Sequence, residues 1–368
     1  MKYIFLSFLC CLGCWTLGQE KEKPIFPTDS LYELPQLFFH DNDTIIKWIE
    51  AGAKYEISSL YTTGFQDTVL RLEQRFHIPL TKALTYEKEQ DIMSQEYDGV
   101  EQFVAISDIH GQYETFVELL EQHGVIDRQL NWIYGKGHLM INGDILDRGA
   151  GVTETLWLVF KLQQQAHEQG GKVHYTIGNH ELMVLDNDLR YIHKKYTAGQ
   201  DILGESYHAQ FSNQSFFGQW MRQNPVMVKI NRTGFVHAGI SPVVIERGLT
   251  PKDINRLFID SIYTQEKDTY RKSEKLNFLA RTHGPVWYRG YFKDDDLTET
   301  DIEKMLQWWN VDRIVVGHTS QKAIITLFGG SVVAIDSSVK YGDRGEVLIY
   351  EKGAFFRGFL NGKRERLE

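Results

Sequence analysis

The alternation of apolar and polar residues becomes regular from about Phe103 onward. Short continuous apolar runs, which are typical of strands covered on both faces, are followed by segments in which apolar residues recur at helical spacing. Helices are predicted over about 113–123 and 153–169, and Gly170-Gly171 closes the second of them. Strands are predicted at residues 103–106, 139–141, 173–177, 226–228, 234–236, 314–316, 324–327 and 347–350. Because strands and helices alternate, the pattern predicts an α/β fold.

The chain begins with a segment of another kind. Lys2 precedes an apolar run over residues 4–15, and small or polar residues follow up to Gln19. A basic start, a short apolar run and small residues before a polar stretch predict a secretory signal peptide over residues 1–19. We therefore expect an exported protein, periplasmic or secreted. A buried N-terminal helix is the alternative for the segment, and lipid anchoring through Cys14 is the alternative for the location.

All three cysteines lie within this segment, at positions 10, 11 and 14. Removal of the signal peptide would leave no thiol, so neither a disulfide nor a cysteine-bound metal is expected in the mature chain. No later apolar stretch approaches the roughly 20 residues that a membrane-spanning helix needs. The mature chain is therefore expected to contain no transmembrane span.

Residues 20–100 show no pattern that indicates chemistry. Their first part is polar and contains several prolines, a hairpin is predicted from the apolar runs 37–40 and 45–49, and a helical segment follows around Leu72. We expect an N-terminal extension that packs on a main domain over residues 101–368. The sequence leaves the role of this extension open.

Composition narrows the classes of function. The 368 residues are 42% hydrophobic and 24% charged, which is ordinary for a globular protein. The formal charge of -9 argues against a general nucleic-acid-binding protein, whose affinity depends on neutralising phosphates with Lys and Arg. No nucleic-acid partner is therefore expected. A small phosphate substrate is still compatible with this charge, because bound metal ions supply local positive charge.

Polar clusters follow five of the predicted strands. In α/β folds, ligands bind at the carboxyl ends of the strands, so these clusters are expected to face one crevice. Each cluster contains at least one side chain that can bind a metal, beside a glycine. The clusters are Ser107-Asp108-Ile109-His110-Gly111, Gly143-Asp144-Ile145-Leu146-Asp147-Arg148-Gly149, Gly178-Asn179-His180-Glu181, His237-Ala238-Gly239 and Gly317-His318-Thr319.

Each cluster alone would fit an ordinary turn or helix cap, whereas five at successive strand ends are not explained by coincident turns. Hydrolysis of an anionic phosphate ester needs charge neutralisation and a nucleophile that is available at neutral pH. Two metal ions about 3.5–4 Å apart supply both. Arginine binds phosphate oxygens in a bidentate way, and a histidine held by a carboxylate can protonate the leaving group.

The first three clusters resemble, in their order, the signature of the phosphoprotein phosphatase family within the calcineurin-like metallophosphoesterases. The resemblance covers residues 103–350. The stretch Gly284-Pro285-Val286-Trp287-Tyr288-Arg289-Gly290 resembles the bacterial-type, Shewanella-like branch of that family. The resemblance implies two packed mixed β-sheets flanked by helices, with a metal site at the carboxyl ends of strands.

The resemblance also implies two divalent or trivalent metal ions and their ligands. A mixed set of nitrogen and oxygen donors suits Mn, Fe or Zn, and the sequence does not select among them. By the resemblance, the first ion would be held by Asp108, His110 and Asp144. Asp144 would bridge to the second ion, which adds Asn179, His237 and His318.

Further roles follow from the same resemblance. His180 would donate a proton to the leaving group, and Asp147 would orient it. Arg148 and Arg289 would bind the phosphate, although Arg281 lies near Arg289 in the sequence.

An inserted cap is predicted at about 186–225, between the third and fourth clusters. It contains many aromatic residues, among them Tyr191, Tyr196 and Tyr207. Packing of these side chains within the insertion is preferred to a role in shaping the substrate site.

The resemblance implies an enzyme that hydrolyses phosphate monoesters by attack of metal-activated water. Expected substrates are phosphotyrosine or phosphoserine/threonine side chains of proteins, or small phosphate esters. One alternative is a nucleotide or dinucleoside polyphosphate hydrolase that uses the same metals. Another is an inactive, metal-bound binding protein. The sequence leaves the physiological substrate and the oligomeric state open.

Overall fold

The computed structural model describes residues 32–87, 95–294 and 297–367. The signal peptide predicted at 1–19 lies outside the described residues and stays a prediction. Within the described part of the chain, no helix has both the length and the apolar character that crossing a membrane requires.

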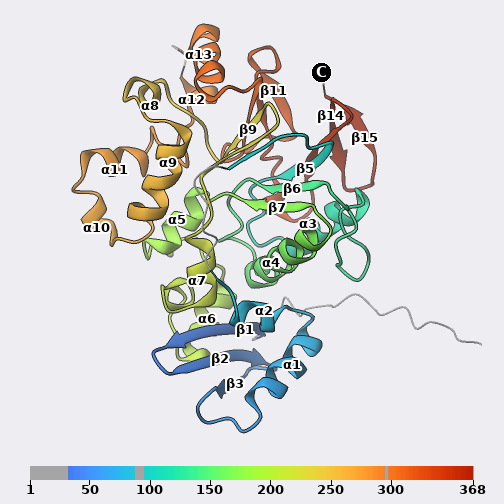
Figure 1. Ribbon diagram of the computed structural model, residues 1–368, viewed down its shortest axis with the longest axis vertical. Coiled ribbons are helices and arrows are strands. Elements are labelled where there is room, and N and C mark those ends of the chain that lie inside the picture. The colour runs from blue at the N-terminus through green and yellow to red at the C-terminus, as the bar shows by residue number, and fades with distance from the viewer. Residues whose placement is uncertain (1–31, 88–94, 295–296, 368) are drawn as a thin grey trace, which may run out of the picture.

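Two six-stranded sheets form the centre of the molecule (Figure 1). In the first, β5, β6 and β7 are parallel neighbours, so that their carboxyl ends lie at one edge. The remaining strands extend this sheet in antiparallel order from β5. In order, the sheet comprises β15 (Arg364–Arg366), β14 (Ala354–Phe359), β13 (Glu346–Glu351), β5 (Gln102–Ile106), β6 (His138–Ile141) and β7 (Lys172–Tyr175).

The second sheet is also mixed. Its strands β9 and β10 are parallel neighbours, and β12 runs parallel to β10 on the other side. The carboxyl ends of β9 and β10 therefore lie at one edge of this sheet. In order, this sheet comprises β11 (Ile325–Leu327), β12 (Val332–Ala334), β10 (Arg313–Val316), β9 (Thr233–Val236), β8 (Met227–Ile230) and β4 (Glu96–Tyr97).

The inner faces of the two sheets pack on each other through a buried apolar layer. Phe103 of the first sheet meets Phe235 of the second edge to face, with ring centroids 5.4 Å apart. Met140 and Val315 belong to the same cluster and are fully buried. The strands in this layer are covered on both faces, which explains their continuous apolar sequences.

Helices cover the outer faces of the sheets. On the first sheet these are α3 (Tyr113–Gln122) and α4 (Val152–Glu168), which lie together in Figure 1. On the second, the Trp309 ring at the end of α13 (Glu299–Trp309) packs on Gly234 of β9. The other helices are α1 (Phe65–Phe76), α2 (Leu80–Leu84), α5 (Asn179–Leu185), α6 (Lys194–Leu203), α7 (Phe216–Met221), α8 (Pro242–Glu246), α9 (Pro251–Leu257), α10 (Lys267–Tyr270), α11 (Glu274–Leu279) and α12 (Gly290–Lys293).

A separate three-stranded sheet precedes the two central ones. It consists of β1 (Glu33–His40), β2 (Asp43–Glu50) and β3 (Ala53–Ser58), all antiparallel, which confirms the hairpin predicted from the sequence. The sheet contacts α6 and α7, and β1 also reaches α4. The amide of Phe39 donates to the carbonyl of Gln214, 2.6 Å away. The N-terminal strands thus contact the region in which the cap is predicted.

A buried ionic network joins these parts. Lys195 of α6 lies 2.7 Å from Glu154 of α4 and 3.3 Å from Glu33 of β1, and all three side chains are at most 5% exposed. Burial lowers the pKa of Lys195, but the two carboxylates outweigh burial and raise it. Glu33 also hydrogen-bonds Thr153 at the start of α4. One cation therefore holds two buried carboxylates from different elements.

Replacement of Lys195 by Met is expected to lower the free energy of unfolding by about 3–5 kcal/mol, because Glu33 and Glu154 would stay buried without a cation. Urea unfolding followed by circular dichroism measures this change. Lys194→Met is the matched control, since Lys194 is exposed on the same helix. A loss for Lys195→Met no larger than that of the control would contradict the stabilising role of the network.

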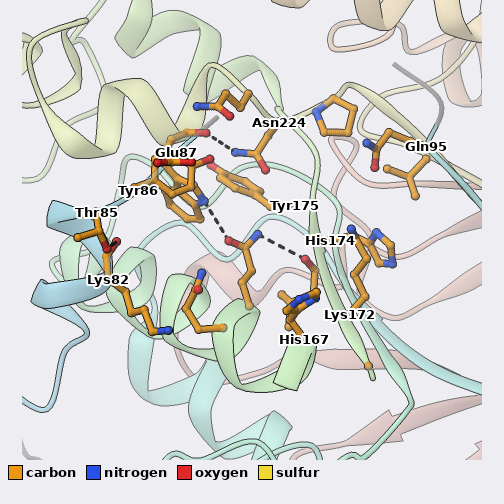
Figure 2. A pocket seen from close by; sticks show the side chains of 18 residues that line it. Lys82, Thr85, Tyr86, Glu87, Gln95, His167, Lys172, His174, Tyr175 and Asn224 are labelled. Carbon is orange, nitrogen blue, oxygen red and sulfur yellow. Dashed lines mark hydrogen bonds between the residues drawn. The ribbon is translucent and has the colours of Figure 1, made fainter. Parts of the chain in front are cut away.

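A polar cavity of about 420 Å³ lies between the end of α4, strand β7 and the loop after α7 (Figure 2). Its lining includes His167, Lys172 and Asn224, together with the aromatic rings of Tyr86 and Trp220. It contains none of the ten site residues predicted from the sequence. All four residues of β7 line the cavity, whereas the predicted cluster follows the carboxyl end of that strand.

Candidate metal centre

The structure brings the five predicted clusters together at the carboxyl edges of the two sheets. They occupy the turns after β5, β6 and β7 of the first sheet and after β9 and β10 of the second. Most of the side chains that they contribute are buried, although many are polar, and Arg148 is exposed. Eight of the predicted site residues have an exposed fraction of 5% or less: Asp108, His110, Asp144, Asp147, Asn179, His180, His237 and His318.

Asp144 is the shared member of two groups of possible metal ligands. One group is Asp144, His110 and His180, and the other is Asp144, His237 and His318. Within each group, one ligand atom from each residue lies within 4.8 Å of the others. Asp144 Oδ2 is 3.7 Å from His110 Nε2 and 3.3 Å from His237 Nε2. A single carboxylate therefore faces two histidine-lined positions.

Backbone carbonyls determine how two of these histidines present their ring nitrogens. His110 Nδ1 donates to the carbonyl of Leu146 at 2.7 Å, and His237 Nδ1 donates to the carbonyl of Asn142 at 2.8 Å. The Nδ1 proton is thereby fixed in both rings, and Nε2 is the nitrogen directed toward Asp144, which can bind a metal once it carries no proton. Hydrogen bonds of this kind fix the tautomer and orientation of metal-binding histidines in proteins.

Asp108 and Asn179 lie beside these groups. Asp108 Oδ1 is 3.9 Å from His110 Nε2, while its Oδ2 accepts from Ser107 Oγ at 2.5 Å and from the amide of His318 at 2.8 Å. Asn179 Oδ1 is 3.1 Å from His237 Nε2. The structure thus brings together all six residues that the sequence predicted as metal ligands.

The chemistry of this donor set fits metal ions. His318 Nε2 is buried and has no hydrogen-bond partner among the described residues. Burial and the neighbouring carboxylate of Asp336 raise the pKa of Asp108, which shows that the carboxylates are crowded. Burial lowers the pKa of His237, but Asp144 and Asp108 outweigh it and raise that pKa to about 10. The surroundings therefore favour positive charge at the place where the ligand atoms meet.

The turns that carry the site depart from ordinary backbone geometry. Six of the predicted site residues adopt positive φ angles between 50° and 71°, although none of them is glycine. Such conformations cost of order 1–3 kcal/mol each and persist where the surrounding structure imposes them, often at functional sites. The residues are Asp108, His110, Asp144, Asp147, Arg148 and His318.

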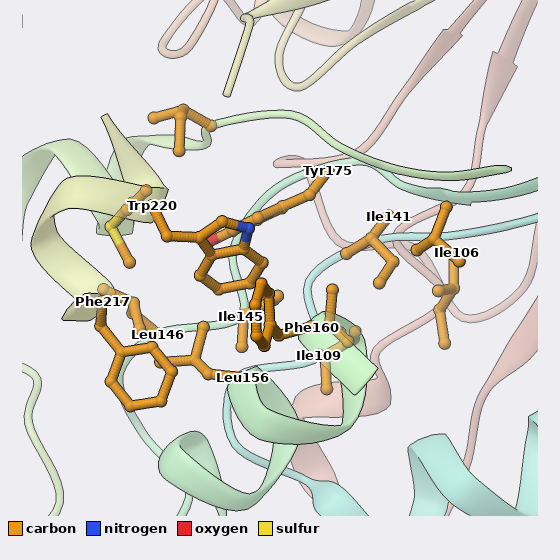
Figure 3. Close-up of a cluster of buried hydrophobic side chains, with 14 of the residues drawn as sticks. Ile106, Ile109, Ile141, Ile145, Leu146, Leu156, Phe160, Tyr175, Phe217 and Trp220 are labelled. Atoms are coloured by element: carbon orange, nitrogen blue, oxygen red, sulfur yellow. The ribbon is translucent and has the colours of Figure 1, made fainter. Parts of the chain in front are cut away.

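Apolar residues between the polar ones fasten the turns to the core. Ile109, Ile145 and Leu146 are fully buried in the cluster formed with α4 and α7 (Figure 3). Figure 3 shows them in one apolar cluster with Leu156 of α4. This alternation directs the polar side chains to the opposite side, toward the ligand positions.

Two glycines allow the clusters to approach one another closely. A Cβ atom on Gly317 would come within 1.9 Å of Ser107 Oγ and 2.5 Å of Asp108 Oδ2. A Cβ atom on Gly178 would come within 2.2 Å of Asp144 Oδ1. A side chain at either position would therefore displace a carboxylate of the site.

His180 lies next to the carboxylate of Asp144, and the carboxylate of Asp147 contacts the other side of its ring. Its Nδ1 is 2.5 Å from Asp147 Oδ2, and its Nε2 is 4.0 Å from Asp144 Oδ2. Its amide donates to Asp144 Oδ1 at 3.0 Å. The Nε2 atom is thereby turned toward the metal centre, as a proton donor requires.

Glu181 is a residue of the site that the sequence analysis did not assign. It is fully buried and accepts four amide hydrogen bonds, from Gly178, Asp144, Ile145 and Leu146, at 2.7–3.1 Å. It therefore ties the turn after β7 to the turn after β6. Its place in Gly-Asn-His-Glu was the available signal, but a glutamate beside a ligand does not reveal that it binds the backbone.

The two predicted arginines border the same centre. Arg148 Nε is 3.3 Å from His110 Nε2, and its Nη2 is 3.4 Å from His180 Nε2. Arg289 Nη1 donates to the carbonyl of His318 at 3.1 Å and to Thr319 Oγ1 at 3.0 Å. Arg281, in contrast, is exposed and bonds Asn277.

Comparisons with known proteins agree with this geometry. The family model of the calcineurin-like phosphoesterases matches residues 102–322. Among solved structures, a cold-active protein-tyrosine phosphatase of a psychrophilic Shewanella species is similar, with a TM-score of 0.80 and 36% identity. The match covers 92% of this chain and 100% of that one.

Curated relatives are similar over shorter stretches. Shewanella-like protein phosphatase 1 of Plasmodium berghei is 28% identical over 240 residues, which are 61% of this chain and 64% of that protein. A symmetrical bis(5'-nucleosyl)-tetraphosphatase of Chromobacterium violaceum is 31% identical over 140 residues, 38% of this chain and 43% of that protein. The predicted fold and the predicted enzyme class, a hydrolase of phosphate esters, are thereby confirmed. The chain belongs to the calcineurin-like phosphoesterase family and resembles its Shewanella-like protein phosphatases.

Proposed function

We propose that the chain is a metal-dependent protein phosphatase that removes phosphate from phosphotyrosine side chains. The observation that carries this proposal is the position of Asp144, which belongs to both groups of possible metal ligands, one of which includes His180. The protein-tyrosine phosphatase activity named for the similar Shewanella enzyme supports the choice of substrate.

The residues present would hold two metal ions. We assign Asp108, His110 and Asp144 to the first ion, and Asp144, Asn179, His237 and His318 to the second. When bound, such a pair neutralises phosphoryl charge and supplies a water-derived nucleophile at neutral pH. His180, which also lies close to Asp144, is assigned to proton transfer because its Nδ1 is already bonded to Asp147.

The chain's own groups would then act on the phosphate ester directly. His180 Nε2 would give its proton to the leaving oxygen, while Asp147 stabilises the protonated ring and keeps Nε2 directed outward. Arg148 and Arg289 border the centre from different elements and would bind the phosphoryl oxygens that do not react. These roles place one acid and two cations around a single phosphate.

A second candidate function is hydrolysis of a dinucleoside polyphosphate. The similarity to bis(5'-nucleosyl)-tetraphosphatases favours it, although the match covers 43% of such a protein. The same metal ligands would serve that reaction, so the metal centre does not separate the two candidates. The leaving group distinguishes the two candidate functions, because cleavage of an anhydride releases a nucleotide, whereas cleavage of an ester releases an alcohol or a phenol.

The purified protein is expected to contain up to two metal ions per chain and to lose phosphatase activity on chelation. Addition of Mn, Fe or Zn ions should restore it. Turnover of a phosphotyrosine peptide, a phosphoserine peptide and diadenosine tetraphosphate should be measured side by side on the reloaded protein. We expect the phosphotyrosine peptide to have the highest kcat/KM. Faster turnover of the tetraphosphate would favour the second candidate, and activity that survives full removal of metal would contradict both.

A further inference from the structure

An exposed tyrosine lies at the rim of the candidate metal centre. Tyr191 is 42% exposed and lies within the segment predicted as a cap. Other aromatic residues of that segment, Tyr196, Tyr207 and Phe211, are at most 2% exposed and pack inside it. The general expectation that the aromatic side chains of the cap serve packing therefore fits these three residues but not Tyr191.

The ring of Tyr191 lies beside two of the residues assigned to catalysis. Its centroid is 5.3 Å from that of His180, and the Arg148 guanidinium lies 5.2 Å from it. The guanidinium of Arg190 is 5.6 Å from the same centroid. The carbonyl of Tyr191 accepts from the amide of Arg148 at 2.8 Å, which fixes its backbone to the turn after β6. The ring is thus held in place while a good part of it stays open to solvent.

The position of His180 determines where the leaving group must lie. A proton donor has to be within about 2.6–3.2 Å of the oxygen it protonates. The leaving oxygen therefore lies next to His180 Nε2, and the carbon attached to that oxygen extends away from the phosphate. Trp287 is near the other side of the centre, with its ring centroid 5.9 Å from that of His318. Of these two partly exposed rings, Tyr191 is the one beside the proton donor.

We propose that the ring of Tyr191 packs against the organic part of the leaving group and thereby favours aromatic phosphate esters over alkyl ones. This inference rests on the proposed function, because it takes His180 as the proton donor. An aromatic leaving group presents a flat apolar face that can stack on a tyrosine ring. The methylene group of phosphoserine offers far less apolar surface to the same ring. Tyr191 would thus determine specificity without taking part in the chemical step.

The test compares Tyr191→Ala and Tyr191→Phe with the wild-type, metal-loaded protein on two peptides of one sequence, with phosphotyrosine or phosphoserine. For Tyr191→Ala we expect kcat/KM on the phosphotyrosine peptide to fall about 2- to 10-fold further than on the phosphoserine peptide, as the loss of one ring contact predicts. The difference should lie in KM. Tyr191→Phe keeps the ring and should keep the preference. Tyr61→Ala, at an 85% exposed tyrosine, is the matched control.

Equal losses on both peptides, or no loss on either, would overturn the inference. Equal losses in kcat would show instead that Tyr191 only positions Arg148 or His180. Wild-type protein that hydrolyses neither peptide would overturn the proposed function and this inference with it. Wild-type turnover with an unchanged preference in Tyr191→Ala would overturn the inference alone.

Discussion

Replacement of His180 by Ala is expected to lower kcat on a phosphoserine peptide roughly 10²- to 10⁴-fold, the range observed when a general acid is lost. The alkoxide released from serine is a poor leaving group and needs a proton as the bond to phosphorus breaks. We propose that His180 supplies it, since its Nδ1 is bonded to Asp147 and its Nε2 faces Asp144 of the candidate metal centre. Metal content should stay close to wild type, because all six proposed ligands remain.

The leaving group provides an internal check on this role. With p-nitrophenyl phosphate the released phenoxide is stable without a proton, so the loss in kcat should be much smaller than with phosphoserine. Asp147→Asn should also lower kcat more with the phosphoserine peptide than with p-nitrophenyl phosphate. The losses should be smaller than for His180→Ala, because the substitution misorients the His180 ring and does not remove it. His167→Ala, at an exposed histidine that lines the distant cavity, serves as control. A His180→Ala protein with equal losses on both substrates, or with none, would show that His180 does not donate the proton.

The sequence predicted the central sheets, and it predicted which side chains would lie together, because both depend on local patterns. Each strand predicted from an apolar run overlaps an observed strand, and the helices predicted at 113–123 and 153–169 are α3 and α4. Parallel strands align their carboxyl ends, so polar clusters that follow such strands have to meet. The positions of Asp108, Asp144 and His237 are a direct result of this rule.

Other features depend on contacts between distant parts of the chain and left no local signal. The four hydrogen bonds that backbone amides donate to Glu181 depend on how the turns after β6 and β7 meet. The network around Lys195 joins β1 to α4 and α6. The sequence alone does not indicate that this lysine is buried, because most lysines lie at the solvated surface. The short strands β4 and β15 have no apolar pattern of their own and form only by pairing with β8 and β14. In each case the decisive partner lies far away in the sequence.

The surroundings of the candidate metal centre also explain why its turns can adopt strained backbone conformations. Positive φ angles at Asp108 and Asp144 would be costly in isolation, but buried apolar residues on either side fasten each turn to the core. Glu181 adds hydrogen bonds to the backbone of the turn after β6. The cost of the conformation is thus offset by packing and hydrogen bonds that are present before any ligand binds. The side chains are consequently arranged in advance for the metal ions that we propose they bind.

Replacement of Asp144 by Asn is expected to remove at least one metal ion and to reduce activity to that of the chelated wild-type protein. Asn has nearly the same shape and can still accept the amide of His180 through Oδ1. It cannot supply the negative charge at the Oδ2 position, which lies 3.7 Å from His110 and 3.3 Å from His237. A neutral amide in place of a shared carboxylate leaves each ion with less compensating charge, so the ions bind weakly or not at all.

Metal content per chain and the melting temperature with and without added Mn test this without relying on activity. Wild-type protein should melt at a higher temperature when the metal is added, since a ligand that binds only the folded state stabilises it. Asp144→Asn should gain little from the metal. Without metal it should be less stable than wild type, because burial raises the pKa of Asp144 but His237, His180 and His110 outweigh burial and hold that pKa well below its usual range, so the charged carboxylate is favoured in the folded protein. Asp312→Asn, at a 66% exposed carboxylate, is the matched control and should respond to metal as wild type does. An Asp144→Asn protein that binds two ions per chain and is stabilised by them to the wild-type extent would show that Asp144 does not bridge.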